Sequence, residues 1–203
     1  MKRLITPALA VLFIIGAAHA ETRSHRGFDS VSATDQIRVE LTAGGAYEVE
    51  VTGRDADRVE TVVDDDTLKI RMRNRPWFRS QRLDAAVRVS MPEIESVAAA
   101  RGVELRASNV NADSFEIAAS MGAEVEISGR CRSLDASASM GAVIRADALQ
   151  CETADVSASM GGTARVYASE SYDGSASMGG TINISGDGAS RGHATAMGGT
   201  INN

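Results

Sequence analysis

The tripeptide Ser-Met-Gly recurs through the C-terminal half of this chain and constrains its fold more than any other feature. Four copies and a fifth reading Ala-Met-Gly carry the methionines Met121, Met140, Met160, Met178 and Met197. Successive methionines lie 19, 20, 18 and 19 residues apart. So short a period in strand-type sequence is typical of a β-solenoid, in which each repeat forms one coil. The sequence therefore predicts an all-β fold with coils of about 19 residues.

Within each repeat, apolar or small residues alternate with polar ones. With each methionine as position zero, positions −6, −4, −2 and +4 are apolar or small, and the intervening positions are mostly Ser, Asp, Glu, Thr or Gly. Alternate residues of a strand point to opposite sides, so the even positions are predicted to face the core. This predicts that the five methionines are core residues. If a bend at the following glycine turned them outward, the row of thioethers would suit Cu(I) instead.

The first 20 residues have the organisation of a secretory signal peptide. Lys2 and Arg3 precede an apolar run, and Ala18-His19-Ala20 fits a small–x–small cleavage site. We expect cleavage after Ala20 and a periplasmic or secreted mature protein. Since residue 21 is Glu and not Cys, a lipoprotein anchor is not expected.

The remaining residues, 21–203, are predicted to form a single β-solenoid domain. Irregular N-terminal strands are expected over 21–91, and the regular Ser-Met-Gly repeats over 92–203. Four alternating stretches indicate half-buried strands in the irregular part, at 37–41, 47–51, 68–72 and 87–91. We expect these strands to form the earlier, less regular coils.

The only two cysteines occupy the same repeat position. Cys131 and Cys151 each lie nine residues before a repeat methionine. Stacked strands lie about 4.8 Å apart, within the Cα–Cα range of roughly 4.4–6.8 Å that a disulfide requires. Because exported proteins fold under oxidising conditions, we predict a Cys131–Cys151 disulfide between adjacent coils. The alternative is a pair of small buried thiols.

Several motifs together resemble a known exported bacterial family. They are an opening Phe-Asp-Ser-Val at 28–31, a Leu-Lys-Ile-Arg strand at 68–71, Val-Arg-Val-Ser-Met-Pro at 87–92, and the Ser/Gly-rich repeats. Over roughly 28–203 the chain is similar to the "putative auto-transporter adhesin head, GIN domain" family, although its repeats read Ser-Ala-Ser-Met-Gly where the family usually has Ser-Gly-Ser-Gly. The resemblance implies a right-handed single-stranded β-helix. It implies no catalytic residues, and the family's function is largely unassigned.

A basic, aromatic loop is the preferred candidate binding element. The whole chain has a net charge of −6, which argues against nucleic acid as a partner, yet residues 69–82 hold six basic residues and no acid. Trp and Phe stack on sugars or acyl chains, and Arg pairs with phosphate or carboxylate. The alternative is that the loop caps the open end of the solenoid. The candidate residues are Arg73, Arg75, Trp77, Phe78, Arg79 and Arg82.

A column of acids at position −5 is a second candidate. Like charges stacked this closely repel by about 1 kcal/mol per pair even in water. Three interpretations remain open: a Ca²⁺ site, paired catalytic acids acting with an arginine such as Arg132 or Arg145, or a solvated face with Asp side chains bonded to nearby backbone. The column comprises Glu116, Asp135, Asp155 and Asp173.

No residue pattern indicates a nucleophilic or zinc enzyme. A catalytic serine needs an oriented base nearby, and after the signal peptide the only histidines are His25 and His193. His193 falls at position −4 and is predicted to pack inside. Two histidines and two cysteines with this spacing do not form a zinc motif. We therefore expect no catalytic residues and no cofactor.

Together these features predict a non-enzymatic, exported β-solenoid that displays a binding surface at the cell envelope. The expected partners are an envelope glycan, a lipid head group or a protein, and not nucleic acid. An uncovered coil edge would favour homodimers formed by end-to-end stacking. The alternatives are a lyase- or hydrolase-like enzyme acting on polysaccharide and a purely structural envelope protein.

Overall fold

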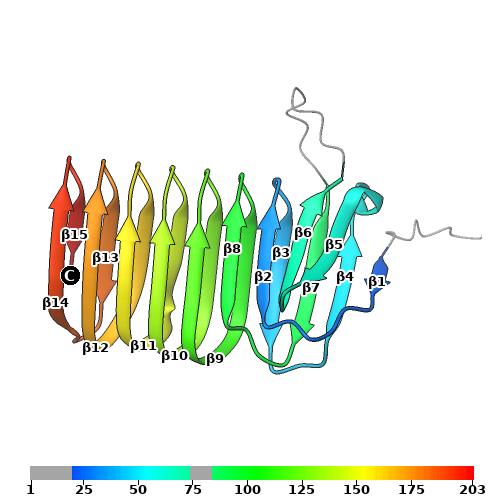
Figure 1. The fold of residues 1–203 in the computed structure, drawn as a ribbon, viewed down its shortest axis with the longest axis horizontal. Helices are drawn as coiled ribbons and strands as arrows, with labels where there is room; N and C mark the ends of the chain where they lie inside the picture. Colours follow the sequence, from blue (N-terminus) through cyan, green and yellow to red (C-terminus); the bar gives the residue numbers. More distant parts are fainter. Residues whose placement is uncertain (1–19, 74–83) are drawn as a thin grey trace, which may run out of the picture.

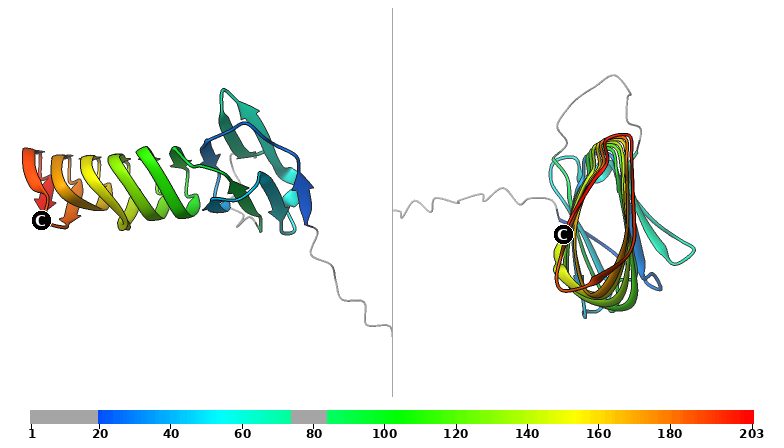
Figure 2. Two further views of the ribbon diagram at one scale, coloured as in Figure 1. Left: turned by 90° about the horizontal axis from the view of Figure 1, so that it is seen from below. Right: turned by 90° about the vertical axis from the view of Figure 1, so that its left-hand side faces the viewer.

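The computed structural model describes residues 20–73 and 84–203 of the chain. Flattened coils stack along one axis and form a narrow ring when viewed end-on (Figures 1 and 2). The solenoid has about five turns of about 20 residues, which confirms the predicted fold class. The elements are β1 (Glu21–Arg23), β2 (Ser30–Thr34), β3 (Arg38–Ala43), β4 (Glu48–Thr52), the 3-10 helix η1 (Ala56–Arg58), β5 (Val59–Asp64), β6 (Thr67–Met72), β7 (Ala86–Met91), β8 (Ser96–Ala100), β9 (Glu104–Ala119), β10 (Glu124–Ala138), β11 (Val143–Ala158), β12 (Thr163–Ser177), β13 (Thr181–Ser185), β14 (Ala189–Ala196) and β15 (Thr200–Asn202).

The coils present two broad faces, and the long strands β9 to β12 bend so that each contributes to both. On one face the strand order is β1-β4-β7-β3-β9-β10-β11-β12-β13-β15. On the other face the strand order is β5-β6-β2-β8, after which β8 pairs with the second half of β9. The second halves of β9 to β12 follow in sequence order, and β14 pairs with β12. Pairing between successive coils is parallel throughout β8 to β15. Each residue of a coil therefore lies over its counterpart in the next.

The interior is filled by columns of equivalent side chains, as the alternation predicts. Position −6 supplies one column, and each of its members is buried: Phe115, Leu134, Ala154 and Tyr172. Burying a large aliphatic or aromatic side chain contributes about 1.5–3 kcal/mol. Small residues beside the large ones keep the two faces close together. The core is thus continuous along the axis, with each coil covering the one before it.

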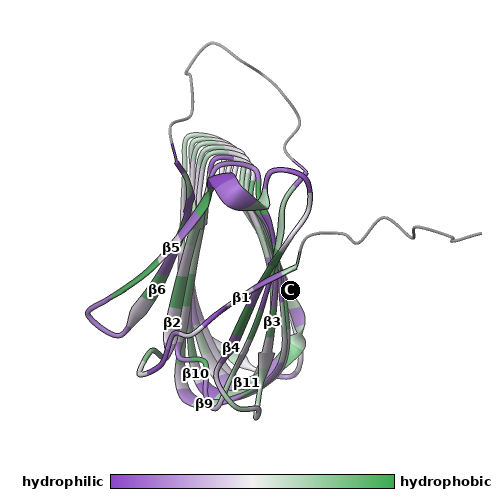
Figure 3. Ribbon diagram, turned by 90° about the vertical axis from the view of Figure 1, so that its right-hand side faces the viewer, coloured by the Kyte–Doolittle hydropathy of each residue, from purple (hydrophilic) through white to green (hydrophobic). Residues whose placement is uncertain are grey.

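The N-terminal strands are built differently from the repeats. The four predicted stretches are confirmed as β3, β4, β6 and β7. They are not simply earlier coils, however, because β2 and β3 stack directly on β8 and β9 while β4 to β7 lie beyond them. The pairs β1–β4, β4–β7 and β5–β6 are antiparallel. The β5–β6 hairpin projects from the ring with a hydrophilic tip (Figure 3).

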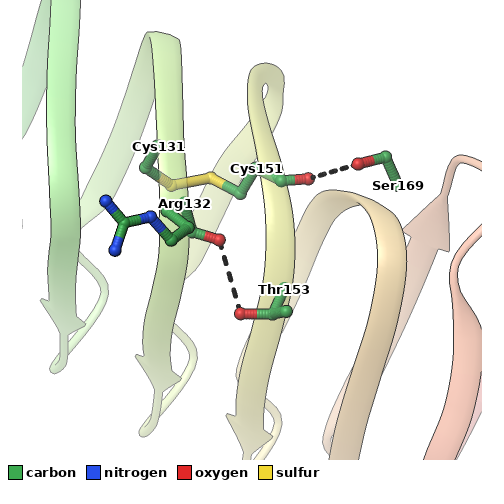
Figure 4. The surroundings of a disulfide bond; sticks show 5 residues. All are labelled: Cys131, Arg132, Cys151, Thr153 and Ser169. Carbon is green, nitrogen blue, oxygen red and sulfur yellow. Dashed lines mark hydrogen bonds between the residues drawn. A yellow bond between two sulfur atoms is a disulfide. The ribbon is translucent and has the colours of Figure 1, made fainter.

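The predicted disulfide joins β10 to β11. Cys131 and Cys151 are direct partners in the strand register, with their Cα atoms 4.5 Å apart. Both cysteines are buried. Nearby, the Thr153 hydroxyl donates to the carbonyl of Arg132 and the Ser169 hydroxyl donates to the carbonyl of Cys151 (Figure 4). The link therefore fastens adjacent coils to each other.

The predicted signal peptide falls almost wholly on residues 1–19, outside the described part of the chain. Within 20–73 and 84–203, no helix has the length and apolarity needed to cross a membrane.

Replacing both cysteines by alanine should lower the free energy of unfolding by about 3 kcal/mol, because the bond closes a loop with a sequence separation of 20. Alanine should fit, since Ala112 and Ala168 occupy the same column in the flanking coils. Urea unfolding followed by circular dichroism measures the difference. Reductant should shift the midpoint of the wild-type protein only. An equal shift in both proteins would contradict a stabilising role for the bond.

Candidate binding surfaces

One broad surface repeats the same polar residues on three successive coils. Its central column is carboxylate, and the columns on either side of it carry hydroxyls. All three columns are in direct register from coil to coil. We call this surface the Ser/Asp face, which consists of Ser133, Asp135, Ser137, Thr153, Asp155, Ser157, Ser171, Asp173 and Ser175.

The carboxylates of this face have no partners within the described chain. Asp135, Asp155 and Asp173 form neither an ion pair nor a side-chain hydrogen bond with any described residue, so the interpretation in which they bond to nearby backbone finds no support. Unit charges 4 Å apart repel by about 1 kcal/mol in water. The row thus carries an electrostatic cost, and its oxygen atoms remain open to a ligand.

The geometry gives no support to a Ca²⁺ site or a catalytic pair on this row. Among the described residues, no three His, Cys, Asp or Glu side chains are placed to hold a metal ion. Asp135, Asp155 and Asp173 line none of four surface hollows of the described chain, although Ser137 lines one of them. Arg132 pairs with Asp113 at 2.5 Å, and Arg145 pairs with Glu124 at 3.1 Å. Neither arginine is available to the carboxylate row.

The opposite surface carries charges of alternating sign, a feature that sequence reasoning missed. Arg88 donates from Nε to Glu40 at 3.1 Å and lies 3.5 Å from Glu50. The hydrogen bond that Arg88 donates to Glu40, followed by the charges of Glu40 and Glu50, raises the pKa of Arg88. Arg88 is exposed and the two glutamates are partly exposed, so solvent screens these ion pairs and their contribution to stability is small. In order along the stack, the column runs Glu50, Arg88, Glu40, Arg106, Glu126, Arg145 and Arg165.

Aligning the repeats at position +5 would have revealed this column of alternating charge, which we call the charge ladder, since Arg106, Glu126, Arg145 and Arg165 all fall there. The alternation ends where Arg165 lies beside Arg145. Arg165 has no ion-pair or hydrogen-bond partner among the described side chains. The rest of the charge ladder is internally neutralised, which distinguishes this surface from the Ser/Asp face.

The basic loop is only partly described. Arg75, Trp77, Phe78, Arg79 and Arg82 lie outside the described residues. Arg73, which follows β6, is exposed, and its backbone N–H donates to the carbonyl of Arg58 at 2.7 Å. The structure therefore leaves the binding role of the loop as a prediction.

Two basic residues that precede the loop are already paired with acids of β5. Lys69 forms an ion pair with Asp64. Arg71 donates to Glu60 at 2.9 Å, and this hydrogen bond lowers the pKa of the Glu60 carboxyl. The cluster of positive charge seen in the sequence is thus partly neutralised where the structure describes it.

The prediction that the repeat methionines fill the core is wrong. Four of them have 44–47% of their surface exposed, and Met197 has 80%. Each adopts a left-handed φ of +46° to +50° and precedes a glycine with φ of +72° to +79°. In the coil of Met140, the N–H of Ala142 donates to the carbonyl of Ser139. These are features of a type I′ turn, which interrupts strand alternation and directs methionine outward.

The prediction that His193 packs inside is also wrong. It keeps the expected register, opposite Gly174, but it is exposed. His193 lies on β14, which pairs only with β12. Without a further coil against it, a residue at this position gains little burial.

Comparison with known proteins agrees with this architecture. Residues 27–188 match the family model "Putative auto-transporter adhesin, head GIN domain". No curated protein matches the sequence. The crystal structure of a putative adhesin from Bacteroides fragilis NCTC 9343 has a TM-score of 0.71 at 17% identity, covering 93% of this chain and 97% of that one. A putative adhesin from Parabacteroides merdae ATCC 43184 has a TM-score of 0.54 at 11% identity, with the same coverage. At these identities the likeness establishes the fold.

Met160→Asn should raise the free energy of unfolding by about 0.5–1 kcal/mol, because asparagine tolerates the left-handed conformation that other L-residues adopt at a cost. Met160→Leu should give no such gain. Urea unfolding of the two variants provides the measurement. A loss of stability in the asparagine variant would show instead that the methionine side chain packs usefully against its neighbours.

Proposed function

The chain belongs to the family of putative auto-transporter adhesin head GIN domains, and from this membership we propose that it is an exported, non-enzymatic binding module of the cell envelope. Its Ser/Asp face is the proposed contact surface, and an envelope glycan is the proposed ligand class.

The observation that carries this proposal is the register of the Ser/Asp face. Carboxylates accept hydrogen bonds and hydroxyls both donate and accept them, so the three columns suit a ligand rich in hydroxyl groups. The same set recurs at about 4.8 Å from coil to coil. A chain of similar sugar units can therefore meet several equivalent contacts at once, and weak individual contacts then combine into useful avidity.

The openness of the face favours binding over catalysis. Catalytic acids work in pairs placed on both sides of a bond in an enclosed site, and one of them usually has a raised pKa. Asp135 and Asp155 are exposed and Asp173 is partly buried, and the three lie in a single row on one side of the coils, which lacks that arrangement. This row retains the ability to hold an extended ligand along the axis of the solenoid.

The proposed location is the periplasm or the extracellular medium. The Cys131–Cys151 bond supports this, because structural disulfides persist in oxidising compartments. Membership of an adhesin family points in the same direction.

The triple change Asp135→Asn, Asp155→Asn and Asp173→Asn should weaken binding to purified envelope polysaccharide by at least about tenfold, because the central acceptors lose their charge. Surface plasmon resonance with immobilised polysaccharide measures this. The matched control is Asp147→Asn, Glu152→Gln and Glu170→Gln, which makes the same charge change at exposed residues outside the Ser/Asp face. This control should bind like the wild type.

A second variant tests the basic loop in the same assay and against anionic lipid vesicles. It combines Arg75→Ala, Trp77→Ala and Arg79→Ala. If only this variant loses binding, the loop and not the Ser/Asp face contacts the ligand. If neither variant changes binding to polysaccharide, vesicles or whole cells, the proposal fails and a structural role remains.

A further inference from the structure

The five turn methionines form one continuous row along an edge of the solenoid. In the first four of these turns the N–H of the glycine donates to the carbonyl of the methionine in the next coil, as in Gly122 to Met140 and Gly141 to Met160, both at 3.1 Å. The turns are therefore stacked directly on one another. Successive methionine backbones lie about 4.8 Å apart. Their thioethers point into solvent on the same edge.

The backbone does not require methionine at these corners. Apart from the methionines and glycines, six described residues are left-handed, and four of them are Asp or Asn, the types that best tolerate this conformation: Asp35, Asp65, Asp66 and Asn109, with Gln36 and Arg101 as the other two. A type I′ turn likewise favours Asn, Asp or Gly at its first central position. Methionine at five such corners costs conformational energy that an asparagine would avoid.

The methionine is also more uniform than the core that surrounds it. Position −6 carries a different residue in each of the coils from Phe115 to Tyr172. The turn position is methionine in all five regular coils, while the corners of the two preceding coils carry Gln36 and Arg101. Among core positions only −2, which is alanine from Ala99 to Ala176, is comparably uniform, and there the narrow interior requires a small residue. The methionine is exposed, so core packing does not account for its uniformity.

We propose that this row binds soft monovalent metal ions, Cu(I) or its analogue Ag(I), through the thioether sulfurs. Thioethers select Cu(I) among biological metals, and they need no deprotonation to bind. A bond from a first-row metal to sulfur is about 2.3 Å long, so two sulfurs on opposite sides of one ion are separated by nearly the coil spacing. Three rotatable bonds let each methionine adjust to the ion.

The central methionines are the best placed. Met140, Met160 and Met178 have a methionine on both sides, so two or three sulfurs from adjacent coils can meet at one ion. Met121 and Met197 each adjoin only one other methionine, and Met197 is the most exposed of the five. We expect about one or two ions per chain.

Other soft ligands of the described chain are not available. Cys131 and Cys151 are joined to each other. Met72 and Met91 are buried in the core. Within residues 20–73 and 84–203, no cluster of three His, Cys, Asp or Glu side chains is placed to hold an ion. Binding of Ag(I) to the mature protein should therefore report on the methionine row.

The test is titration of the mature protein with silver nitrate in chloride-free buffer, followed by calorimetry and by NMR of ¹³C-labelled methionine methyl groups. The methyl signals of Met140, Met160 and Met178 should shift, whereas those of Met72 and Met91 should not. Replacing all five turn methionines by leucine, which keeps an apolar row, should weaken Ag(I) binding by at least about tenfold. Replacing all five by asparagine, which suits the turn, should do the same.

Met72→Leu is the matched control, because it removes a thioether from the core and should leave Ag(I) affinity unchanged. Circular dichroism verifies that each variant is folded. Zn²⁺ and Ca²⁺ should not shift the methyl signals. Undetectable Ag(I) binding by the wild type, or unchanged binding in the five-leucine variant, would overturn the proposal. Since the Ser/Asp face is intact in that variant, its polysaccharide binding should persist, which separates the two proposals.

Discussion

Parallel, in-register hydrogen bonding between coils is the interaction on which the rest of this molecule depends. Because each coil lies residue over residue on the next, no surface feature occurs alone. An outward side chain that recurs in the repeat becomes a row, and an inward one becomes a column of the core. The same rule brings Cys131 against Cys151 and each turn methionine against the next.

Because equivalent residues stack, the charges at one repeat position either alternate in sign from coil to coil or repel one another. Repeated sequence naturally stacks like upon like, so a column of alternating charge requires repeats that differ at that position. The chain does differ at position +5, where Arg106 meets Glu126 and Glu126 meets Arg145. At position −5 it does not, and Asp135 lies over Asp155 with no compensating cation. One surface of the solenoid thus avoids like-charge repulsion by alternating the sign of its charges, whereas the other retains that repulsion. The uncompensated row is the one that gains most from a hydrogen-bonding ligand.

Sequence reasoning was reliable wherever a residue's environment depends on its repeat position alone. Alternation placed Phe115 and Leu134 inside, and the shared position of the cysteines predicted their bond. The prediction failed at the methionines because two consecutive left-handed residues end the alternation. Methionine is not typical of such turns, so it gave no signal of one. The invariant glycine after each methionine was the available signal. The N-terminal strands could not be ordered at all, since without repeats nothing in the sequence indicates that β2 and β3 would stack on β8 and β9 ahead of β4 to β7.

The methionine row and the disulfide have a common mechanical consequence. In a solenoid each coil contacts only its neighbours, so stability is close to a sum of local terms and a link between two coils acts where it is made. The disulfide fastens β10 to β11. An ion held by Met140, Met160 and Met178 would fasten the turns of three coils at another position, stabilising them in proportion to the logarithm of ion concentration over its dissociation constant. Because the bound state adds links along the axis and leaves the Ser/Asp face untouched, metal occupancy would stiffen the scaffold without obstructing the surface proposed to hold the glycan.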